Sequence, residues 1–138
     1  MDIRYPANLE THTNDTIWIR FIDLPDAFAE GRTREEAISN AAEVLSTILA
    51  KLLAESKDAP APSQGMKDVC YIAPDSKTQA AVLLHLARGE RSLSDLARAL
   101  EKTWPAAQRL EDPTHWPSLK TIDRAAAALG KRLVLALE

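Results

Sequence analysis

The spacing of apolar residues changes along the chain and separates a strand-rich part from a helical part. Apolar and polar residues alternate over residues 3–10, which is typical of a half-buried strand. β-Branched and aromatic residues dominate residues 16–23, which favours a second strand, and residues 11–15 predict the turn of a hairpin between them. Residues 24–31 turn again and add a short third strand. Because Pro6 has no backbone N–H, we expect the first strand to lie at a sheet edge or to be bulged there.

The clearest helix is predicted over residues 33–56. Thr33 is placed to cap its first turn and Glu36 follows three residues later, which is the spacing of a capping box. Apolar residues then recur at helical intervals, so we expect one face of this helix to cover the sheet. Residues 56–65 are rich in Pro, Ala and Ser and predict a semi-extended loop. Residues 67–74 predict a short strand that returns to the first sheet.

The second half of the chain is predicted to be mostly helical, and this change places a domain boundary near Pro74. One helix is expected over residues 76–89 and another over residues 118–130. The apolar face of the latter consists of Leu119, Ile122, Ala126 and Leu129. Residues 131–138 predict a terminal strand. The expected fold class is α+β: a β-β-β-α-β domain over residues 1–74, then a helical domain with a C-terminal strand over residues 75–138.

Two short helices are expected close together between residues 92 and 112. Apolar residues form the inner face of each helix, and Ala97 is small enough to let the two cross closely. This pattern is typical of a helix-turn-helix, whose second helix lies in the major groove of DNA. A plain helical bundle is the alternative. The residues expected to contact DNA are Ser92, Lys102, Thr103, Trp104, Ala106, Gln108 and Arg109.

The side chains near the start of the second short helix suit these contacts. Gln108 has the geometry to bind adenine, and Arg109 to bind guanine or phosphate. Ser92, at the start of the first short helix, is placed to bind a phosphate. Trp104 is expected near the helix start, where it either contacts DNA or folds back onto the domain. Trp116, in the following loop, is interpreted as a packing residue.

Local details of the pair leave some points open. Thr103 is one candidate for the residue that caps the second helix; the other is Trp104, because a residue before proline avoids the helical region. Glu101 stands where such turns often have glycine, since that position tends to adopt a positive φ. Lys102 stands where an apolar residue is common. The last two features weaken the match to a helix-turn-helix.

Charge is distributed unevenly over the 138 residues, whose formal net charge is −3. Residues 1–75 carry 7 basic and 13 acidic side chains, whereas residues 76–138 carry 10 basic and 7 acidic ones. One explanation of this uneven charge is two ordinary solvated surfaces. The other is an acidic half that binds a basic partner and a basic half that binds phosphates. The single Cys70 forms no internal disulfide, and the chain starts without an apolar signal core. We therefore expect a cytoplasmic protein without a membrane segment.

Several motifs in order resemble the HicB-type antitoxins, in the branch with a C-terminal Xre/Cro-like helix-turn-helix. The motifs are Arg4-Tyr5-Pro6, Asp23-Leu24-Pro25, Gly31 with Thr33, Glu36 and Ala37, and the run from Ala125 to Leu133. The resemblance covers almost the whole chain. It implies a partial ribonuclease H-like domain followed by a DNA-binding domain.

The resemblance also implies partners. It implies that the chain binds and neutralises a small basic HicA-type toxin, an mRNA-cleaving ribonuclease, and represses its own operon as a dimer or higher oligomer on palindromic operator DNA. An acidic surface suits a partner that binds RNA. Candidates for toxin contact are Trp18, Asp23, Asp26 and Glu30; the alternative is a solvated turn and a core indole. Leu133, Leu135 and Leu137 are expected to pair with a second copy, which hides an apolar edge.

Other functions are weaker matches to the sequence. A ligand-sensing regulator without a toxin partner is the alternative. Metal-dependent hydrolysis comes third, because it needs several converging carboxylates and the sequence offers only Asp23 and Glu36. His12, His85 and His115 are scattered, and no catalytic triad spacing, glycine-rich phosphate loop or cysteine pair is found. We expect neither a catalytic residue nor a cofactor or metal.

Overall fold

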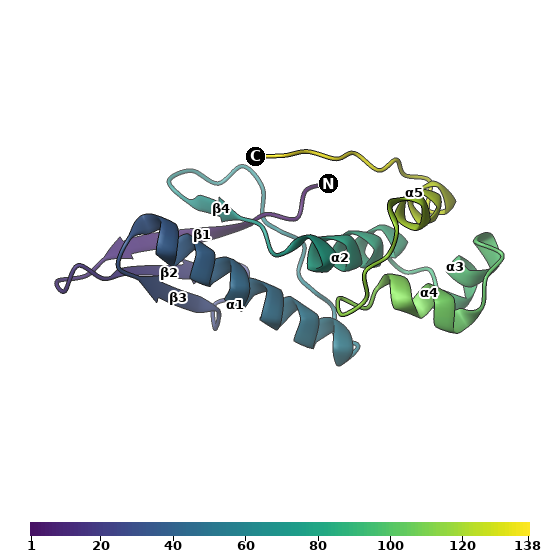
Figure 1. Cartoon of the computed structure of the whole chain (residues 1–138), viewed down its shortest axis with the longest axis horizontal. Helices are drawn as coiled ribbons and strands as arrows, with labels where there is room; N and C mark the ends of the chain where they lie inside the picture. The colour runs from purple at the N-terminus through teal and green to yellow at the C-terminus, as the bar shows by residue number, and fades with distance from the viewer.

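A computed structural model describes residues 1–138. A four-stranded antiparallel sheet with one long helix lies at one end of the elongated molecule, and a group of three short helices lies at the other (Figure 1). One further helix, α2, lies between them. In chain order the elements are β1 (Tyr5–Thr11), β2 (Ile17–Phe21), β3 (Phe28–Gly31), α1 (Arg34–Ala54), β4 (Cys70–Ile72), α2 (Ser76–Arg88), α3 (Leu93–Ala99), α4 (Trp104–Leu110) and α5 (Leu119–Ala128). The α+β class and the β-β-β-α-β order are as predicted.

The strand order β3-β2-β1-β4 places β1 inside the sheet, so the expectation of an edge or bulge at Pro6 is wrong. Pro6 is opposite Tyr71 of β4, and its carbonyl accepts a hydrogen bond from Ile22 N at 3.0 Å. The pairing of β1 with β2 begins one residue later, at Ala7 and Phe21. The N–H and C=O groups of one strand residue point to the same side, so the backbone nitrogen of Pro6 points toward the end of β2. The ladder between β1 and β2 starts only after Pro6, and the lack of an N–H there removes none of its residue pairs.

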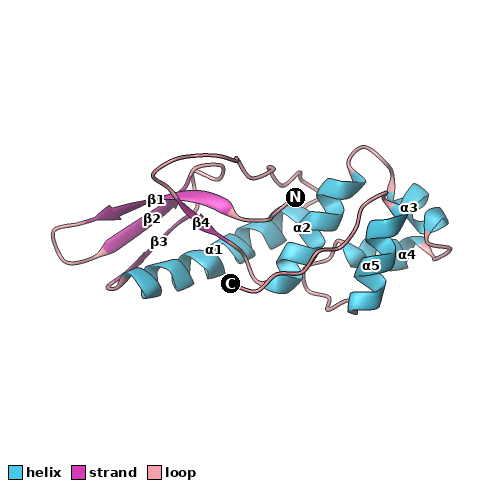
Figure 2. Ribbon diagram, turned by 90° about the horizontal axis from the view of Figure 1, so that it is seen from above, coloured by secondary structure: helices cyan, strands magenta, loops and turns pink.

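Helix α1 covers one face of the sheet, as the hydrophobic pattern predicts (Figure 2). Thr33 caps it by accepting a hydrogen bond from Glu36 N at 3.1 Å. Its buried stripe consists of Ala37, Ala41, Leu45 and Leu49. By length and composition α1 also matches a membrane span, and its packing on the sheet accounts for this apolar character.

Gly31 is the point of closest approach between the sheet and α1. A Cβ added to Gly31 would lie 2.5 Å from the backbone nitrogen of Ala37 and 2.8 Å from its Cα. Both atoms belong to the backbone of α1, so no side-chain rotation can relieve the clash. Glycine is therefore required where β3 ends and α1 begins.

Helix α2 contributes to two hydrophobic cores. Val82 belongs to the core between the sheet and α1, whereas Leu84 belongs to the core among the short helices. The predicted domain boundary at Pro74 lies just before α2 in the sequence. In the structure α2 packs against the elements before this boundary as well as those after it. We call the sheet with α1 the first unit and the helices from α2 onward the second unit.

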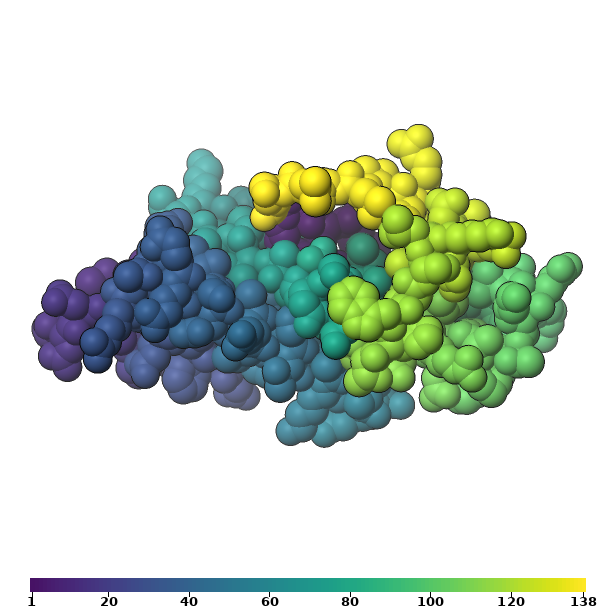
Figure 3. All heavy atoms as spheres, in the orientation of Figure 1, coloured from purple at the N-terminus to yellow at the C-terminus, as the bar shows by residue number.

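The C-terminal segment 131–138 is not a strand, which corrects the prediction. It runs alone as an extended tail and arches over a hollow above the N-terminal residues (Figure 3). Arg4 contacts Asp2 and the terminal residue Glu138 through ion pairs. Apolar alternation favours a strand, but a strand needs a hydrogen-bonded neighbour, and a single chain provides none here. Leu119, expected on the inner face of α5, is 60% exposed because that face is formed by residues further along the helix.

Candidate functional site

The pair of α3 and α4 is built from local capping signals. Ser92 caps α3 in a reciprocal box with Asp95, in which each side chain binds the other's backbone N–H. Thr103 caps α4, accepting from Ala106 N at 3.3 Å, so Thr103 and not Trp104 is the boundary residue. Trp104 occupies the first helical position instead. The inner faces predicted for the two helices, Leu96, Ala97 and Leu100 of the first and Ala107 and Leu110 of the second, share one core, in which only Leu100 is partly buried.

The turn between the two helices places Glu101 at φ +55°, in the left-handed region. The backbone N–H groups of Glu101 and Lys102 donate to the carbonyls of Arg98 and Ala97, which closes α3. This is the conformation for which such turns usually use glycine. The sequence departs from that pattern in residue type but keeps its geometry.

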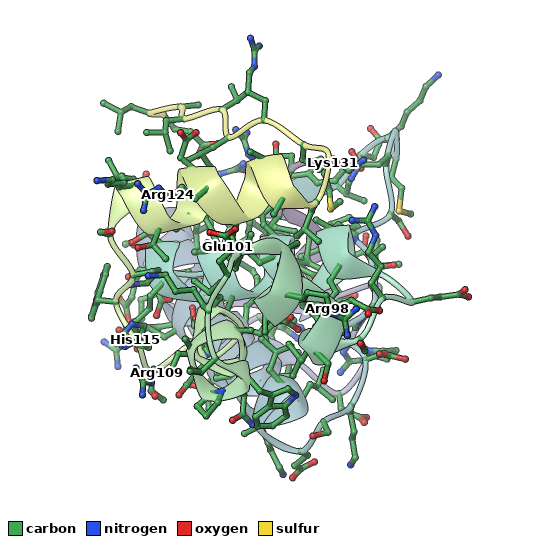
Figure 4. The ribbon with its side chains drawn as sticks, turned by 90° about the vertical axis from the view of Figure 1, so that its right-hand side faces the viewer. Arg98, Glu101, Arg109, His115, Arg124 and Lys131 are labelled. Atoms are coloured by element: carbon green, nitrogen blue, oxygen red, sulfur yellow. The ribbon has the colours of Figure 1, made fainter.

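Six of the seven predicted DNA-contacting residues are exposed, and Ala106 is the exception. Ser92, Lys102, Thr103, Gln108 and Arg109 are exposed. The indole of Trp104 is 46% exposed and does not fold back into the core, and Ala106 is half-buried. Figure 4 shows Arg109 on the same side of the second unit as His115 and Arg124, with Arg98 on the other side of α3.

An ionic cluster that sequence analysis missed connects α4 to α2. The carboxylate of Glu111, the residue that ends α4, is 9% exposed. It accepts hydrogen bonds from Arg88 Nε at 2.6 Å, Arg88 Nη2 at 2.9 Å and His85 Nδ1 at 2.8 Å. His85 Nε2 also lies 3.5 Å from Asp58 Oδ1, in the loop after α1. These partners are more than 20 residues apart, and no local pattern indicates such a pairing.

The cluster changes the protonation equilibria of its members. Burial of the Glu111 carboxyl acts to raise its pKa, but the hydrogen bonds from His85 and Arg88 outweigh burial and the pKa is lowered. The hydrogen bond to Glu111 raises the pKa of His85, and burial opposes this only in part. All three groups are therefore stabilised in their charged forms, and α4 is fixed to α2 by charge-assisted bonds.

A second candidate surface is the sheet face away from α1. Trp18 stacks on Phe28, with ring centroids 5.8 Å apart, and the His12 ring lies 4.9 Å from Trp18. Trp18 pairs with Glu30 of β3 and with Glu10 of β1, so acidic residues lie on both sides of its ring, whereas Phe28 pairs with Arg20 of β2. Phe28 is 49% exposed. Phe28 was missed by sequence analysis; the strand register places it opposite Arg20 and diagonally across from Trp18.

The four predicted toxin-contact residues separate into two places. Trp18 and Glu30 share the open sheet face, whereas Asp23 and Asp26 lie in the turn between β2 and β3. Asp26 is exposed. The Asp23 carboxylate accepts a hydrogen bond from Ser63 N at 2.8 Å, which ties the long loop before β4 to the sheet. Burial and then the charge of Asp23 raise the pKa of Tyr5 to about 12.

The residues considered for catalysis are not brought together. Glu36 lies in the first turn of α1, and Asp23 is bonded to Ser63. His85 belongs to the Glu111 cluster and His12 to the aromatic group on the sheet. No group of three or more His, Cys, Asp or Glu side chains has the arrangement of a metal site.

Two hollows border these elements. A polar cleft of about 460 Å³ lies between the end of α1 and the end of α4, lined by Lys57, Asp58, Gln108 and Arg109 among others. A mostly apolar cavity of about 210 Å³ lies beneath the C-terminal tail, against Leu83, Leu84 and Ile122. Ligand sites usually measure about 300–1,000 Å³, so the apolar cavity is small for a sensed metabolite.

Known proteins similar to this chain are antitoxins of one family. Residues 4–74 match the family described as HicB_like antitoxin of bacterial toxin-antitoxin system. Antitoxin HicB 2 of Photorhabdus laumondii is 32% identical over 137 residues, covering 97% of this chain and 96% of the relative. Antitoxin HicB of Escherichia coli K12 is 28% identical and covers 98% of this chain and 99% of the relative.

Proposed function

Because the chain belongs to the HicB-like antitoxin family, we propose that this antitoxin neutralises a small basic HicA-type toxin and represses its own operon by binding operator DNA. In this proposal the first unit binds the toxin in the cytoplasm, and the second unit binds a palindromic operator as a homodimer or higher oligomer. It needs no cofactor and catalyses no reaction.

The observation that carries the DNA-binding part is the geometry of α3 and α4. Two short capped helices are joined by a turn with Glu101 at positive φ, as in a helix-turn-helix. The outer side of α4 exposes Trp104, Gln108 and Arg109, which suits a helix that enters the major groove. The net positive charge of the second half supports the same proposal.

The toxin-binding part rests on the open face of the sheet. Exposed aromatic rings bordered by carboxylates are typical of a surface for a basic protein, because the rings supply buried area and the charges supply complementarity. Phe28 provides an exposed ring and Trp18 a half-buried one. Glu10 and Glu30 provide the negative charge beside Trp18, with Arg20 opposite Phe28. We propose that Asp26 adds to this charge from the neighbouring turn, and that Asp23 acts mainly by holding the loop at Ser63.

The dimer part rests on the C-terminal tail. Leu135 is 66% exposed and Leu137 is fully exposed, and the segment 131–138 has no strand partner. Pairing with the tail of a second copy hides these side chains and gives the backbone its hydrogen bonds. Leu133 is half-buried and joins the same apolar edge. A two-fold dimer then suits two operator half-sites.

The test of DNA binding uses Gln108→Ala and Arg109→Ala in a mobility-shift assay with the DNA upstream of the gene. We expect each to weaken binding by about 10- to 100-fold, the usual cost of one base contact, without an effect on toxin binding. Arg32→Ala, an exposed arginine in the first unit, is the matched control and should bind normally. If both variants bind DNA as the wild type does, α4 is not the recognition helix.

The test of toxin binding is gentle co-purification of the tagged chain from its own host. We expect a small basic companion whose ribonuclease activity is seen only after separation. Trp18→Ala should release it, whereas Trp104→Ala should not. If the chain purifies alone but still binds upstream DNA, the ligand-sensing regulator becomes the better proposal.

A further inference from the structure

Trp116 is not a packing residue, which corrects the sequence interpretation. Its side chain is 67% exposed, in the loop between α4 and α5. Neighbouring residues fix this loop: Pro113 is buried, and the Asp112 carboxylate accepts hydrogen bonds from Thr114 N at 2.9 Å and Thr114 Oγ1 at 2.7 Å. His115 N donates to Asp112 O at 3.1 Å. A large ring is thus presented to solvent by a loop that is internally bonded.

A cation lies over the exposed ring. Lys77 Nζ, from the first turn of α2, lies 5.6 Å from the centroid of Trp116. Lys77 has no acidic partner among the ion pairs of the chain, and neither have Arg109, Lys120 and Arg124. Glu111, at the end of α4, is bound to Arg88 and His85 within its cluster. The Asp112 carboxylate at the start of the loop is held by Thr114. The loop therefore presents an exposed ring beside a cation, with one carboxylate at its start.

The loop that holds the ring directly follows the proposed recognition helix in the chain. Trp116 follows α4 by six residues and precedes the Ser118 cap of α5 by two. In Figure 4, His115, its neighbour in the chain, lies on the same side of the second unit as Arg109 at the end of α4 and Arg124 of α5. DNA that lies along the outer side of α4 thus passes close to this loop.

We propose that Trp116 and Lys77 form a second DNA-contact point, which binds the sugar–phosphate backbone next to the groove that α4 enters. The indole packs on the sugar edge or an adjoining base, and the ammonium binds a phosphate, a combination common in nucleic-acid sites. Backbone contacts of this kind fix the position of a protein on DNA without reading sequence. This inference rests on the proposed DNA-binding function.

The first experiment places a reporter at the site. The chain has three tryptophans, so protein labelled with fluorotryptophan gives three fluorine NMR signals, and Trp116→Phe identifies the signal of Trp116 while Trp18 and Trp104 stay in place. We expect this signal to shift when upstream DNA is added, over the same concentration range as the mobility shift. If DNA binds and the signal does not change, Trp116 is an exposed side chain only and the inference is wrong. If the toxin and not DNA shifts the signal, the loop is a protein-binding surface and the inference is also wrong.

The second experiment measures affinity. Trp116→Ala should weaken DNA binding by about 5- to 100-fold, the usual range for loss of one aromatic stacking contact, and by a similar factor on unrelated sequences. Lys77→Ala should reduce the slope of log affinity against log salt concentration by about one, the value for one lost phosphate contact. Lys51→Ala, an exposed lysine on α1, is the matched control. Unchanged affinity and salt slope in both test variants would overturn the inference.

Failure of the inference and failure of the proposed function give different results. If the wild-type chain shifts no DNA at all, the proposed repressor function fails. If the wild type and Trp116→Ala shift DNA equally while Arg109→Ala does not, the repressor function stands and the second contact point fails.

Discussion

The two units of this antitoxin differ in what holds them together. The first core has 14 buried apolar residues, including Tyr5, Phe21 and Leu45, and most of them join segments far apart in sequence. The second core has seven, and all of them are alanine or leucine. Because the second core has half as many buried apolar residues, the second unit gains less from hydrophobic burial.

The second unit depends more on polar contacts. Helices α3 and α4 have seven residues each, which is too short for stability in isolation. Ser92 and Thr103 cap them, and the Glu111 cluster fixes α4 to α2. The sheet therefore presents one proposed surface on a large apolar core, whereas helix caps and one ionic cluster hold the other in place.

The largest effect is expected from Gly31→Ala in the first unit. The added Cβ would lie 2.5 Å from the backbone of Ala37, so α1 must shift on the sheet. We expect a loss of about 3 kcal/mol in the free energy of unfolding, as in severe overpacking, measured by urea denaturation with circular dichroism. Gly130→Ala, where no atom lies within 4 Å but φ is +73°, is the control and should cost about 1 kcal/mol. Equal losses would show that the contact at Gly31 is not tight.

The next largest effect is expected from Glu111→Gln in the second unit. The change leaves Arg88 partly buried without its counter-charge, and we expect a loss of about 2 kcal/mol, at the low end for a broken ion pair because Arg88 is 16% exposed. Urea denaturation measures it. Glu101→Gln, at an exposed position, is the matched control. DNA binding should weaken together with stability, since α4 loses its anchor; an unchanged free energy would contradict this account.

A gain in stability is expected from Glu101→Gly. Glu101 has φ +55°, a conformation that costs a residue with a Cβ about 1 kcal/mol and costs glycine little. The thermal midpoint should rise, and the shift of DNA should not change. Lower stability would mean that the Glu101 side chain makes a contribution larger than the strain.

The smallest effect is a pH dependence due to His85. The Glu111 hydrogen bond raises the pKa of His85, so the folded protein holds this proton more tightly than the unfolded chain does. This stabilisation is fully present below the ordinary imidazole pKa of about 6.5 and is lost as the pH rises above it through the higher folded pKa. We expect the urea midpoint of the wild type to fall as the pH rises. His85→Gln should abolish this fall, whereas His115→Gln should retain it. Parallel pH profiles for wild type and His85→Gln would contradict the assignment.

Much of the fold was predictable because its signals are local. The hairpin, the caps at Thr33 and Ser92 and the buried stripe of α1 follow from residue type and spacing within a few positions. The outer residues of α4 were predictable for the same reason, since helical period decides which side of a short helix is buried. The indole of Trp104 was the open case, and the structure shows it exposed.

Sequence alone therefore determined the elements, their caps and the motifs of the family. Only the tertiary structure decided that Glu111 meets Arg88 and His85, that Trp18 stacks on Phe28, that β1 is an inner strand and that residues 131–138 form no strand. It also decided that Trp116 is exposed beside Lys77. The physical reason is that helices and caps need only neighbours in the chain, whereas ion clusters, strand ladders and exposure depend on which distant segments packing brings together.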